Sequence, residues 1–298
     1  MNKMILVTGG SGRFAKTLKK NSRGIKYKQR TILVWNEVAP FYHKRWAKNE
    51  IGPFAVTKKL LDSSKIKKGD SVLDLACGTG LVTKKLIRKV GSKGQIYGID
   101  SSESAIKIAR KWTGDPKNLH FVRADAERIQ FKTQFDAITC QYALFFFPDE
   151  QKVLKNMKKL LKKNGIISLA VHGKYNVPYF DCILEPVKKM IPDYLPKYPE
   201  MDRFGTKETF VDVIKKAGFS KIVVKKFVFQ YSPGTYSDYW NNYKRHLSKP
   251  LKEKFDSLTK IQKSNLREMV KDKTLEYTKK DRKIVFPWEV LVLTAKKQ

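Results

Sequence analysis

The sequence predicts an α/β fold built on a seven-stranded, mostly parallel sheet with helices on both faces and additional helical cap elements. Two observations lead to this prediction. Short apolar runs typical of strands alternate with amphipathic runs typical of helices, and turn residues separate them. Apolar strands of this kind are typical of a parallel sheet that is covered on both faces. With 298 residues, 41% of them hydrophobic, the chain can bury a sizeable core.

The helices and strands are expected in a regular order after an initial helical cap, residues 25–70, which Pro40 is expected to interrupt. Strands are expected at 71–76, 95–100, 119–124, 135–141, 165–172, 221–229 and 288–295. Helices are expected at 81–90, 103–112, 150–162 and 207–216, the last of them stopped by Gly218. The sheet domain therefore spans 71–298 and carries two inserts, at about 174–204 and 233–283, that are expected to cover the substrate.

The net charge of +34 raises the question of nucleic acid. Of the 62 basic residues only 12 are arginines, and the lysines are spread over the whole chain. Specific readers of phosphates and bases use the bidentate arginine fork, usually in a local cluster. The charge is therefore interpreted as solvated surface, with only non-specific, salt-sensitive binding of nucleic acid expected.

Compartment and metal content follow from the apolar runs and the cysteines. No apolar run approaches the roughly 20 residues of a membrane span. The N-terminus lacks the pattern of a secretory signal. Cys77, Cys140 and Cys182 are widely spaced without a C-x-x-C pair, so neither a metal site nor a disulfide framework is expected. These features predict a cytoplasmic protein without a membrane span, and they leave its oligomeric state open.

A glycine loop joins the first predicted strand of the sheet to its helix. Gly78 and Gly80 would let a ligand approach the backbone closely, and the start of the helix offers free N–H groups. Asp74, at the end of the strand, would repel the pyrophosphate of a dinucleotide. It would attract a ligand that carries an ammonium and a sulfonium group. The loop therefore favours S-adenosylmethionine (SAM) over NAD.

Two further acids follow the next two strands. Asp100 lies 20 residues beyond Gly80, where a carboxylate can hydrogen-bond both ribose hydroxyls of a nucleoside. Asp125 follows the third strand, where it can accept from the exocyclic amine of adenine. A lone aspartate in such a turn is often only a helix cap. Three of them at the carboxyl edge of one parallel sheet, where ligands bind, indicate a nucleoside site.

These segments resemble the class I SAM-dependent methyltransferases, including the type that acts in ubiquinone and menaquinone biosynthesis. The resemblance rests on VLDLACGTG (72–80), GIDSS (98–102), ADAE (124–127), FDAITCQYALFFFPD (135–149) and VLKNMKKLLKKNGIISL (153–169). It covers residues 71–172 strongly, and it implies a Rossmann-like methyltransferase sheet with SAM as cofactor. The motifs are specific to the fold and the cofactor but not to a substrate.

The resemblance also implies which residues contact the cofactor. These are Tyr42, Asp74, Ala76, Gly78, Gly80, Asp100, Ser101, Asp125, Ala126 and Gln141. The tyrosine belongs to the helical cap and matches one that lies over the methionine end in related enzymes. The chain departs from the pattern at Ala76, where many members have glycine, and the small side chain should still fit.

No motif marks a catalytic base. His172, at the end of the fifth strand, and Tyr142 are weak candidates, and a satisfied polar role is the more common one for such a histidine. His43 is less well placed. Aromatic residues gather in 39–46, in 143–147 after the fourth strand and in 231–243. Most are expected to be core, but an apolar, lidded cleft suits a small hydrophobic or aromatic acceptor, quinone-like in the leading hypothesis.

Two other functions stay open at this point. An RNA or DNA methyltransferase is motivated by the charge, although the N/D-P-P-Y-like tetrapeptide of amino-methylating enzymes is absent after the fourth strand, at 140–143. The near match Asn176–Tyr179 follows the fifth strand instead and is interpreted as a loop. The other alternative is a protein that binds SAM without catalysis.

A second glycine motif lies at the front of the chain, in residues 1–24. Thr8–Ala15 resembles the opening of an NAD(P)-dependent epimerase or dehydrogenase. Such a site needs a second strand that ends in an acid about 20 residues later, and the chain runs into the helical cap instead. We expect this extension to have no nucleotide site of its own, and a chain that starts near Arg23 to keep cofactor binding.

Overall fold

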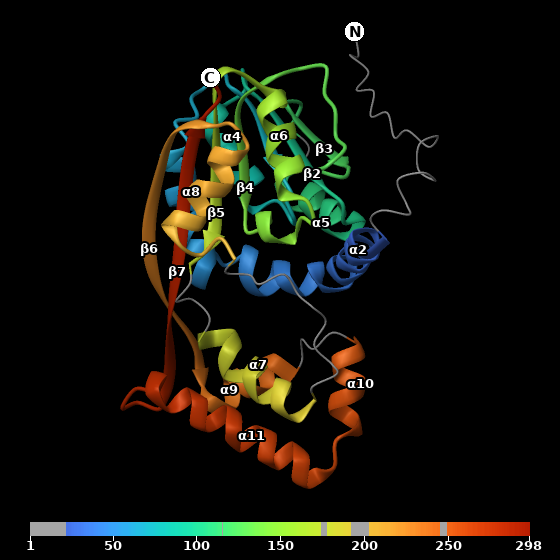
Figure 1. Cartoon of the computed structure of the whole chain (residues 1–298), viewed down its shortest axis with the longest axis vertical. Helices are drawn as coiled ribbons and strands as arrows, with labels where there is room; N and C mark the ends of the chain where they lie inside the picture. The colour runs from blue at the N-terminus through green and yellow to red at the C-terminus, as the bar shows by residue number, and fades with distance from the viewer. Residues whose placement is uncertain (1–21, 115, 174–177, 192–202, 245–248) are drawn as a thin grey trace.

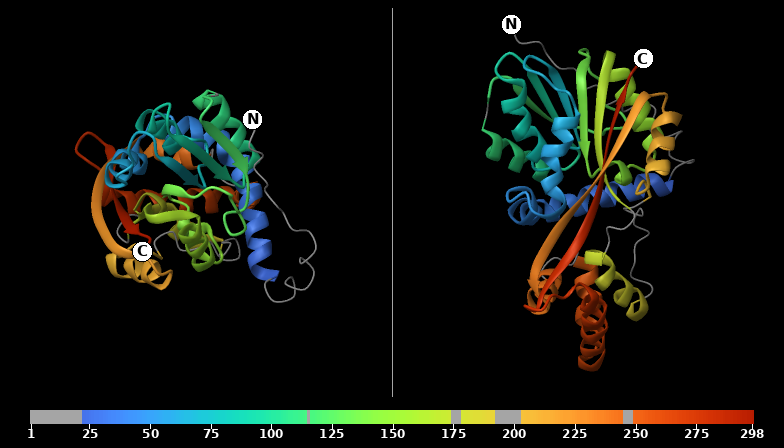
Figure 2. Two further views of the ribbon diagram at one scale, coloured as in Figure 1. Left: turned by 90° about the horizontal axis from the view of Figure 1, so that it is seen from above. Right: turned by 90° about the vertical axis from the view of Figure 1, so that its left-hand side faces the viewer.

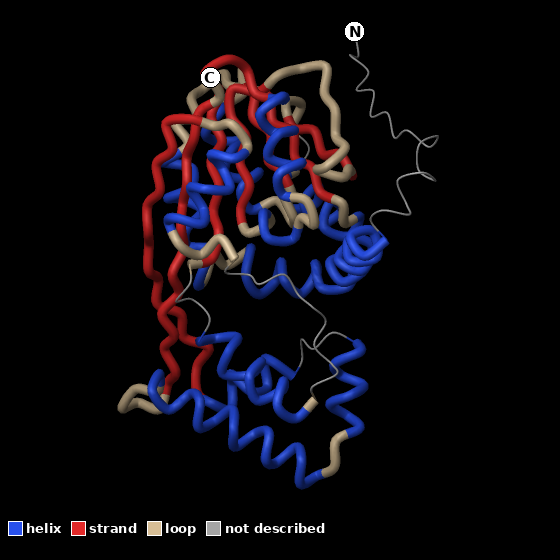
Figure 3. Tube along the Cα trace, viewed as in Figure 1, coloured by secondary structure: helices blue, strands red, loops and turns tan. Residues whose placement is uncertain are grey.

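We describe a computed structural model of the chain, in which residues 22–114, 116–173, 178–191, 203–244 and 249–298 are described (Figure 1). The glycine motif of Thr8–Ala15 and the first half of the near match Asn176–Tyr179 lie outside the described residues. Pro178 and Tyr179, which were expected in a loop, begin the helix Pro178–Met190 instead. The described part consists of an α/β domain and a helical arm that two long strands join to it (Figures 1 and 3).

A seven-stranded, mostly parallel sheet forms the centre of the α/β domain, as predicted. Its order is β3-β2-β1-β4-β5-β7-β6, and only β7 is antiparallel to its neighbours. The strands are β1 (Ser71–Leu75), β2 (Gln95–Asp100), β3 (Leu119–Arg123), β4 (Phe135–Gln141), β5 (Leu161–His172), β6 (Ser220–Thr235) and β7 (Lys283–Lys296). The strand order reverses at β1: β2 and β3 lie on one side of it, and β4 and the later strands lie on the other. The carboxyl ends of β1, β2 and β4 therefore border one crevice, where ligands bind in such sheets.

Helices cover both faces of the sheet. On one face α3 (Val56–Ser63), α4 (Leu81–Val90) and α5 (Glu103–Thr113) pack in a row, and on the other α6 (Glu150–Leu160) packs beside α8 (Lys207–Lys216) (Figure 2). Side chains cap their first turns: Ser102 accepts from the Ala105 N–H, and Asp149 accepts from the Lys152 N–H. Buried valine, isoleucine and leucine of β1, β4 and β5 fill the space between these layers.

Helix α2 (Ser22–Tyr42) lies across the carboxyl edge of the sheet. The expected interruption at Pro40 is wrong, because the helix continues through it and then becomes a π-helical turn at His43–Ala47. A proline inside a helix removes one backbone hydrogen bond, and the helix continues here although Pro40 lies in its last turn, next to the buried Ala39. The chain then reaches α3 through a 3₁₀ turn, Gly52–Ala55.

The two predicted inserts come together in one helical arm. It contains α7 (Pro178–Met190), α9 (Tyr236–Lys244), α10 (Lys249–Ser257) and α11 (Lys260–Thr274), and α11 packs on α7 and α9. Strands β6 and β7 are longer than predicted, because they pair with each other beyond the end of β5 and carry the arm (Figure 1).

A cluster of aromatic rings joins the arm to the α/β domain. Trp46 lies 5.0 Å from Tyr231, 5.9 Å from Tyr179 and 6.0 Å from Trp288, measured between ring centroids. Tyr231, Tyr179 and Trp288 are buried, and Tyr239 beside them is too. The aromatic residues of 231–239 therefore belong mostly to the core, as the sequence led us to expect for most of them.

Candidate active site

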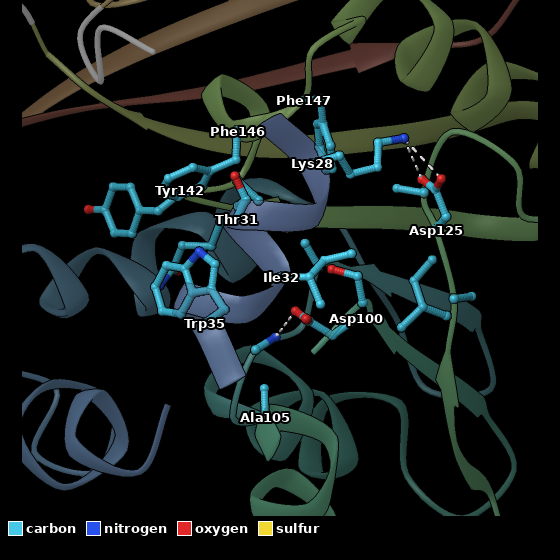
Figure 4. Close-up of a pocket in the computed structure, with 18 of the residues that line it drawn as sticks. Lys28, Thr31, Ile32, Trp35, Asp100, Ala105, Asp125, Tyr142, Phe146 and Phe147 are labelled. Carbon is cyan, nitrogen blue, oxygen red and sulfur yellow. Dashed lines mark hydrogen bonds and ion pairs between the residues drawn. The ribbon is translucent and has the colours of Figure 1, made fainter. Parts of the chain in front are cut away.

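A narrow cavity lies between α2 and the carboxyl ends of β1, β2 and β4 (Figure 4). Its volume is about 110 Å³. Helix α2 forms one wall with Lys28, Thr31, Ile32, Trp35 and Tyr42, and the segment after β4 forms another with Ala143, Phe146, Phe147 and Pro148. The floor consists of the turns after β1, β2 and β3, which bring together most of the residues that the sequence assigned to the cofactor.

The glycine loop after β1 enters the cavity at two of its three small residues. Ala76 and Gly78 line the cavity, and both adopt a left-handed φ of +54°. A side chain on Gly78 would meet open space, which leaves its backbone accessible to a ligand. Gly80 does not line the cavity: a Cβ there would lie 3.1 Å from Cβ of Ala109, so this glycine allows α4 and α5 to pack closely.

Asp100 links the end of β2 to the glycine loop. Its Oδ2 accepts a hydrogen bond from the Gly78 N–H at 2.9 Å, and its Oδ1 accepts from the Ser102 N–H at 2.8 Å. Burial raises the pKa of this carboxyl, and the backbone N–H bonds oppose that shift. Asp100 and the neighbouring Ser101 both line the cavity.

Asp125 and Ala126, after β3, line the far end of the cavity. Both carboxylate oxygens of Asp125 accept from Nζ of Lys28 on α2, at 3.2 and 2.9 Å. The same ammonium lies 2.8 Å from Oε2 of Glu127. One lysine of the cap helix therefore bridges two acids beside the cavity, a contact that the sequence analysis did not anticipate.

Asp74 lies behind the glycine loop and outside the cavity lining. Its side chain is buried, with Oδ2 accepting from the Thr83 hydroxyl at 2.5 Å and Oδ1 accepting from the Thr139 hydroxyl at 2.9 Å. Burial raises its pKa to about 6, and the two threonine hydrogen bonds oppose the shift. The structure thus places this acid differently from the sequence analysis, which had it contacting the ligand.

Gln141, the last residue of β4, presents an unusual atom to the cavity. Its Oε1 is buried, and no donor among the described residues is within hydrogen-bond reach. An unsatisfied buried acceptor costs about 1–3 kcal/mol. Such an atom inside a cavity suits a ligand that brings its own donor.

The near end of the cavity is aromatic. The ring of Trp35 stands edge-on to that of Tyr42 at 5.2 Å and to that of Phe146 at 5.7 Å. Burial, with a smaller effect of the Asp100 charge, raises the pKa of Tyr42. Figure 4 shows Ile32 beside Asp100, with Trp35 and Phe146 further from it. Of residues 143–147, Ala143, Phe146 and Phe147 line the cavity, and Leu144 and Phe145 belong to the core.

The two weak candidates for a base are both engaged in the structure. Nδ1 of His172 accepts from the Trp288 indole at 3.2 Å, and its ring stacks on that of Tyr142 at 4.3 Å. Burial lowers the pKa of His172 to about 3, so the ring is neutral. The Tyr142 hydroxyl donates to the Pro53 carbonyl at 2.7 Å, and burial raises its pKa. Tyr142 borders the cavity, and His172 does not.

Helix α2 and the π-helical turn after it touch each of the three turns through one polar side chain. Besides Lys28 at the β3 turn, Oδ1 of Asn36 accepts from the Ser102 hydroxyl at 2.8 Å after β2. His43 lies in the π-helical turn, and its Nδ1 is 3.1 Å from Oγ1 of Thr79 in the glycine loop. These positions recur at two-turn spacing, which places them on one helix face. That spacing was visible in the sequence, but the sequence analysis did not use it.

Comparison with known proteins identifies the family. Residues 66–218, slightly more than half of the chain, match the family model described as "Methyltransferase domain". The chain belongs to this family. It is a SAM-dependent methyltransferase, as the resemblance implied. The match begins at residue 66 and does not include Thr8–Ala15, where no working nucleotide site is expected.

Named relatives and solved structures agree with the family. The chain is 28% identical to the demethylmenaquinone methyltransferase of Staphylococcus epidermidis over 198 residues, which are 62% of this chain and 78% of that protein. It is 28% identical to the Staphylococcus aureus enzyme of the same name over 183 residues, 57% of this chain and 76% of that one. Two structures share its fold with a TM-score of 0.55: a candidate methyltransferase from Bacillus halodurans and the YcgJ protein from Bacillus subtilis. They are 21% and 15% identical, and each match covers 82% of this chain and 99% or 98% of the other.

Two further observations bear on partners and metals. Across the described residues, every helix is too short or too polar to span a bilayer. Within the same residues, no group of three or more histidine, cysteine, aspartate or glutamate side chains could hold a metal ion. Cys77, Cys140 and Cys182 are buried free thiols.

Proposed function

We propose that the cavity under α2 is the SAM site and that it holds the cofactor along the edge of the sheet. In this arrangement the adenine lies at Asp125 and Ala126, the ribose at Asp100, and the methionine end at Gln141 and Tyr42. The order of the acids along adjacent strands supports this direction, because a nucleoside placed on Asp100 has its base toward β3. The open backbone at Gly78 gives the cofactor room to pass the loop.

The orphan acceptor of Gln141 is the observation on which the orientation depends most. The methionine ammonium of SAM would donate to Oε1 and satisfy the one buried oxygen that the cavity leaves without a partner among the described residues. Asp74 takes a supporting role in this proposal. Through Thr83 and Thr139 it ties the start of α4 to β4, and so it holds the glycine loop in place.

We propose a small hydrophobic or aromatic acceptor, quinone-like in the leading case. The wall of Ile32, Trp35, Phe146 and Phe147 supports it, since flat apolar rings suit an aromatic ring system. A second support for this acceptor class is the name of the relatives, demethylmenaquinone methyltransferase. We also propose the domain division predicted from sequence, with a helical cap at 25–70 and a methyltransferase domain at 71–298. We propose a cytoplasmic location for the protein.

Catalysis in this proposal needs positioning more than proton transfer. Bound SAM supplies a methyl group on a sulfonium, which leaves as a neutral thioether. The chain's residues align the acceptor and exclude water, chiefly through α2 and the segment after β4. His172 is neutral and holds Trp288, and the Tyr142 hydroxyl is engaged with Pro53, so we propose that neither removes a proton. An enol or phenol would then lose its proton to solvent before it enters the site and react as its anion.

The test compares ligands first and acceptors second. Thermal shift with S-adenosylhomocysteine, SAM and NAD(P) should show stabilisation by the first two alone, and Gly78→Arg should abolish it. Labelled SAM is then offered with a short-chain demethylmenaquinol, with total RNA and with DNA. Methylation of the quinol supports the proposal. Methylation of nucleic acid alone, or SAM binding without transfer to the quinol, would overturn the quinone-like acceptor class.

A further inference from the structure

The cavity under α2 is narrow for a complete cofactor. Its volume of about 110 Å³ compares with roughly 300–1,000 Å³ for typical small-molecule sites. The sheet is held by continuous strand pairing, whereas α2 lies over its edge, packs along α5 and reaches the turns after β3 and β2 through Lys28 and Asn36. Among the walls of this cavity, α2 is the one that a ligand the size of SAM can displace without breaking strand pairing.

Among the contacts of α2, the one between Lys28 and Asp125 obstructs the entry of adenine most directly. The proposed SAM site, on which this inference rests, needs an oxygen of Asp125 for the exocyclic amine of adenine. Both oxygens of Asp125 accept from Lys28. Oδ1 also accepts from the Glu127 N–H at 3.0 Å. An adenine amine and the Lys28 ammonium thus compete for the same carboxylate.

Glu127 offers the lysine another position. Its Oε2 already lies 2.8 Å from Nζ of Lys28, and its side chain is only 10% exposed. Its second oxygen, Oε1, is buried with no hydrogen-bond partner among the residues described. A buried carboxylate with one oxygen that lacks a hydrogen bond favours the binding of a donor at that oxygen. If Lys28 moves onto Glu127, the ammonium keeps its charge partner and Oδ2 of Asp125 no longer accepts from it, while Oδ1 keeps the Glu127 N–H.

We propose that Lys28 is a latch: it holds α2 against Asp125 in the empty protein and transfers to Glu127 when adenine enters. Lys28 and Glu127 are then positioning residues for the cofactor, and neither touches the reacting methyl group. Charge is conserved in the exchange, since one ammonium leaves Asp125 and a neutral amine replaces it. Glu127 should therefore contribute to cofactor affinity when Lys28 is present and contribute much less when it is absent.

A double-mutant cycle tests the latch. The dissociation constant of S-adenosylhomocysteine is measured by calorimetry, and its association rate by stopped flow, for the wild type, Lys28→Met, Glu127→Gln and the double variant. We expect Glu127→Gln to weaken binding about fivefold or more when Lys28 is present, and less than about twofold when it is Met. Lys28→Met should also speed association, because the latch no longer has to open. Arg30→Met, on the exposed side of α2, is the matched control and should change neither quantity.

The possible results distinguish a failure of the latch from a failure of the proposed SAM site. Equal weakening by Glu127→Gln in both backgrounds, or an association rate that Lys28→Met leaves unchanged, overturns the latch. Failure of the wild type to bind S-adenosylhomocysteine overturns the proposed SAM site itself. Circular dichroism and thermal midpoints establish that each variant is folded, and Glu127→Met replaces Glu127→Gln in the cycle if the latter is not.

Discussion

Oδ2 of Asp100 lies 2.9 Å from the backbone nitrogen of Gly78, so a carboxylate at the end of β2 holds the glycine loop that follows β1. The same side chain lines the cavity and accepts from the Ser102 N–H. Asp100 therefore shapes the loop and faces the proposed ribose position at once. A change at this residue should affect stability and cofactor binding together.

For Asp100→Asn we expect both effects. The amide keeps one acceptor oxygen, and its nitrogen faces a backbone N–H that it cannot satisfy. Unfolding free energy should fall by about 1–3 kcal/mol, and the dissociation constant of S-adenosylhomocysteine should rise about tenfold or more. Chemical denaturation and calorimetry measure the two. Asp62→Asn, which removes an exposed ion pair with Lys58, should change both little, and an unaltered affinity in Asp100→Asn would count against the proposed site.

For Gln141→Met we expect stability and binding to move in opposite directions. Methionine is similar in size and has no unsatisfied amide, so the empty protein should gain about 1 kcal/mol. The affinity for S-adenosylhomocysteine should fall about tenfold, because the ligand ammonium loses its acceptor. Thermal denaturation with and without ligand shows both changes. A fall in stability without a change in affinity would mean that Oε1 serves the protein and not a ligand.

For Ala76→Gly we expect a small gain in stability. Ala76 has a φ of +54°, a conformation that costs an L-residue about 1–2 kcal/mol and glycine almost nothing. Greater flexibility of the unfolded chain offsets about 0.4–1 kcal/mol of this gain. Ala137→Gly, in the buried strand β4, is the control and should destabilise the protein. If both changes destabilise equally, the backbone at residue 76 is not strained.

For His172→Gln we expect a weaker dependence of stability on pH. Burial lowers the pKa of His172 to about 3, against 6.5 for a free histidine, so the unfolded chain binds the extra proton between these values. The stability that His172 contributes is complete above pH 6.5 and is lost as the pH falls toward 3. At pH 4 the loss is on the order of 3 kcal/mol relative to pH 7.

Glutamine at residue 172 can still accept from Trp288 but does not titrate, so this part of the acid-induced loss should disappear. Denaturant unfolding of both proteins from pH 4 to pH 8 measures the difference. The pKa of Asp74, raised to about 6 by burial, acts in the opposite direction in both proteins and cancels in the comparison. Parallel pH profiles would show that His172 is accessible to protons in the folded protein.

The sequence located the strands and the glycine loop because local patterns encode them. A strand buried on both faces must be an apolar run, and a loop that turns from strand to helix needs small residues such as Ala76 and Gly78. Asp100 and Asp125 could be placed as well, because the ends of adjacent parallel strands meet at one edge. The seven strands follow from these rules, even where β6 and β7 extend beyond their predicted ends.

Tertiary structure alone decided which of these residues face the cavity and what covers it. Asp74 turns away because Thr83 and Thr139, brought near by packing and not by sequence, satisfy both of its oxygens. Lys28 reaches Asp125, 97 residues further along the chain, because α2 crosses the carboxyl edge of the sheet. Local periodicity specifies a helix and its faces, but a long-range contact depends on where the whole chain packs, and that determines which acid is structural and which is open to a ligand.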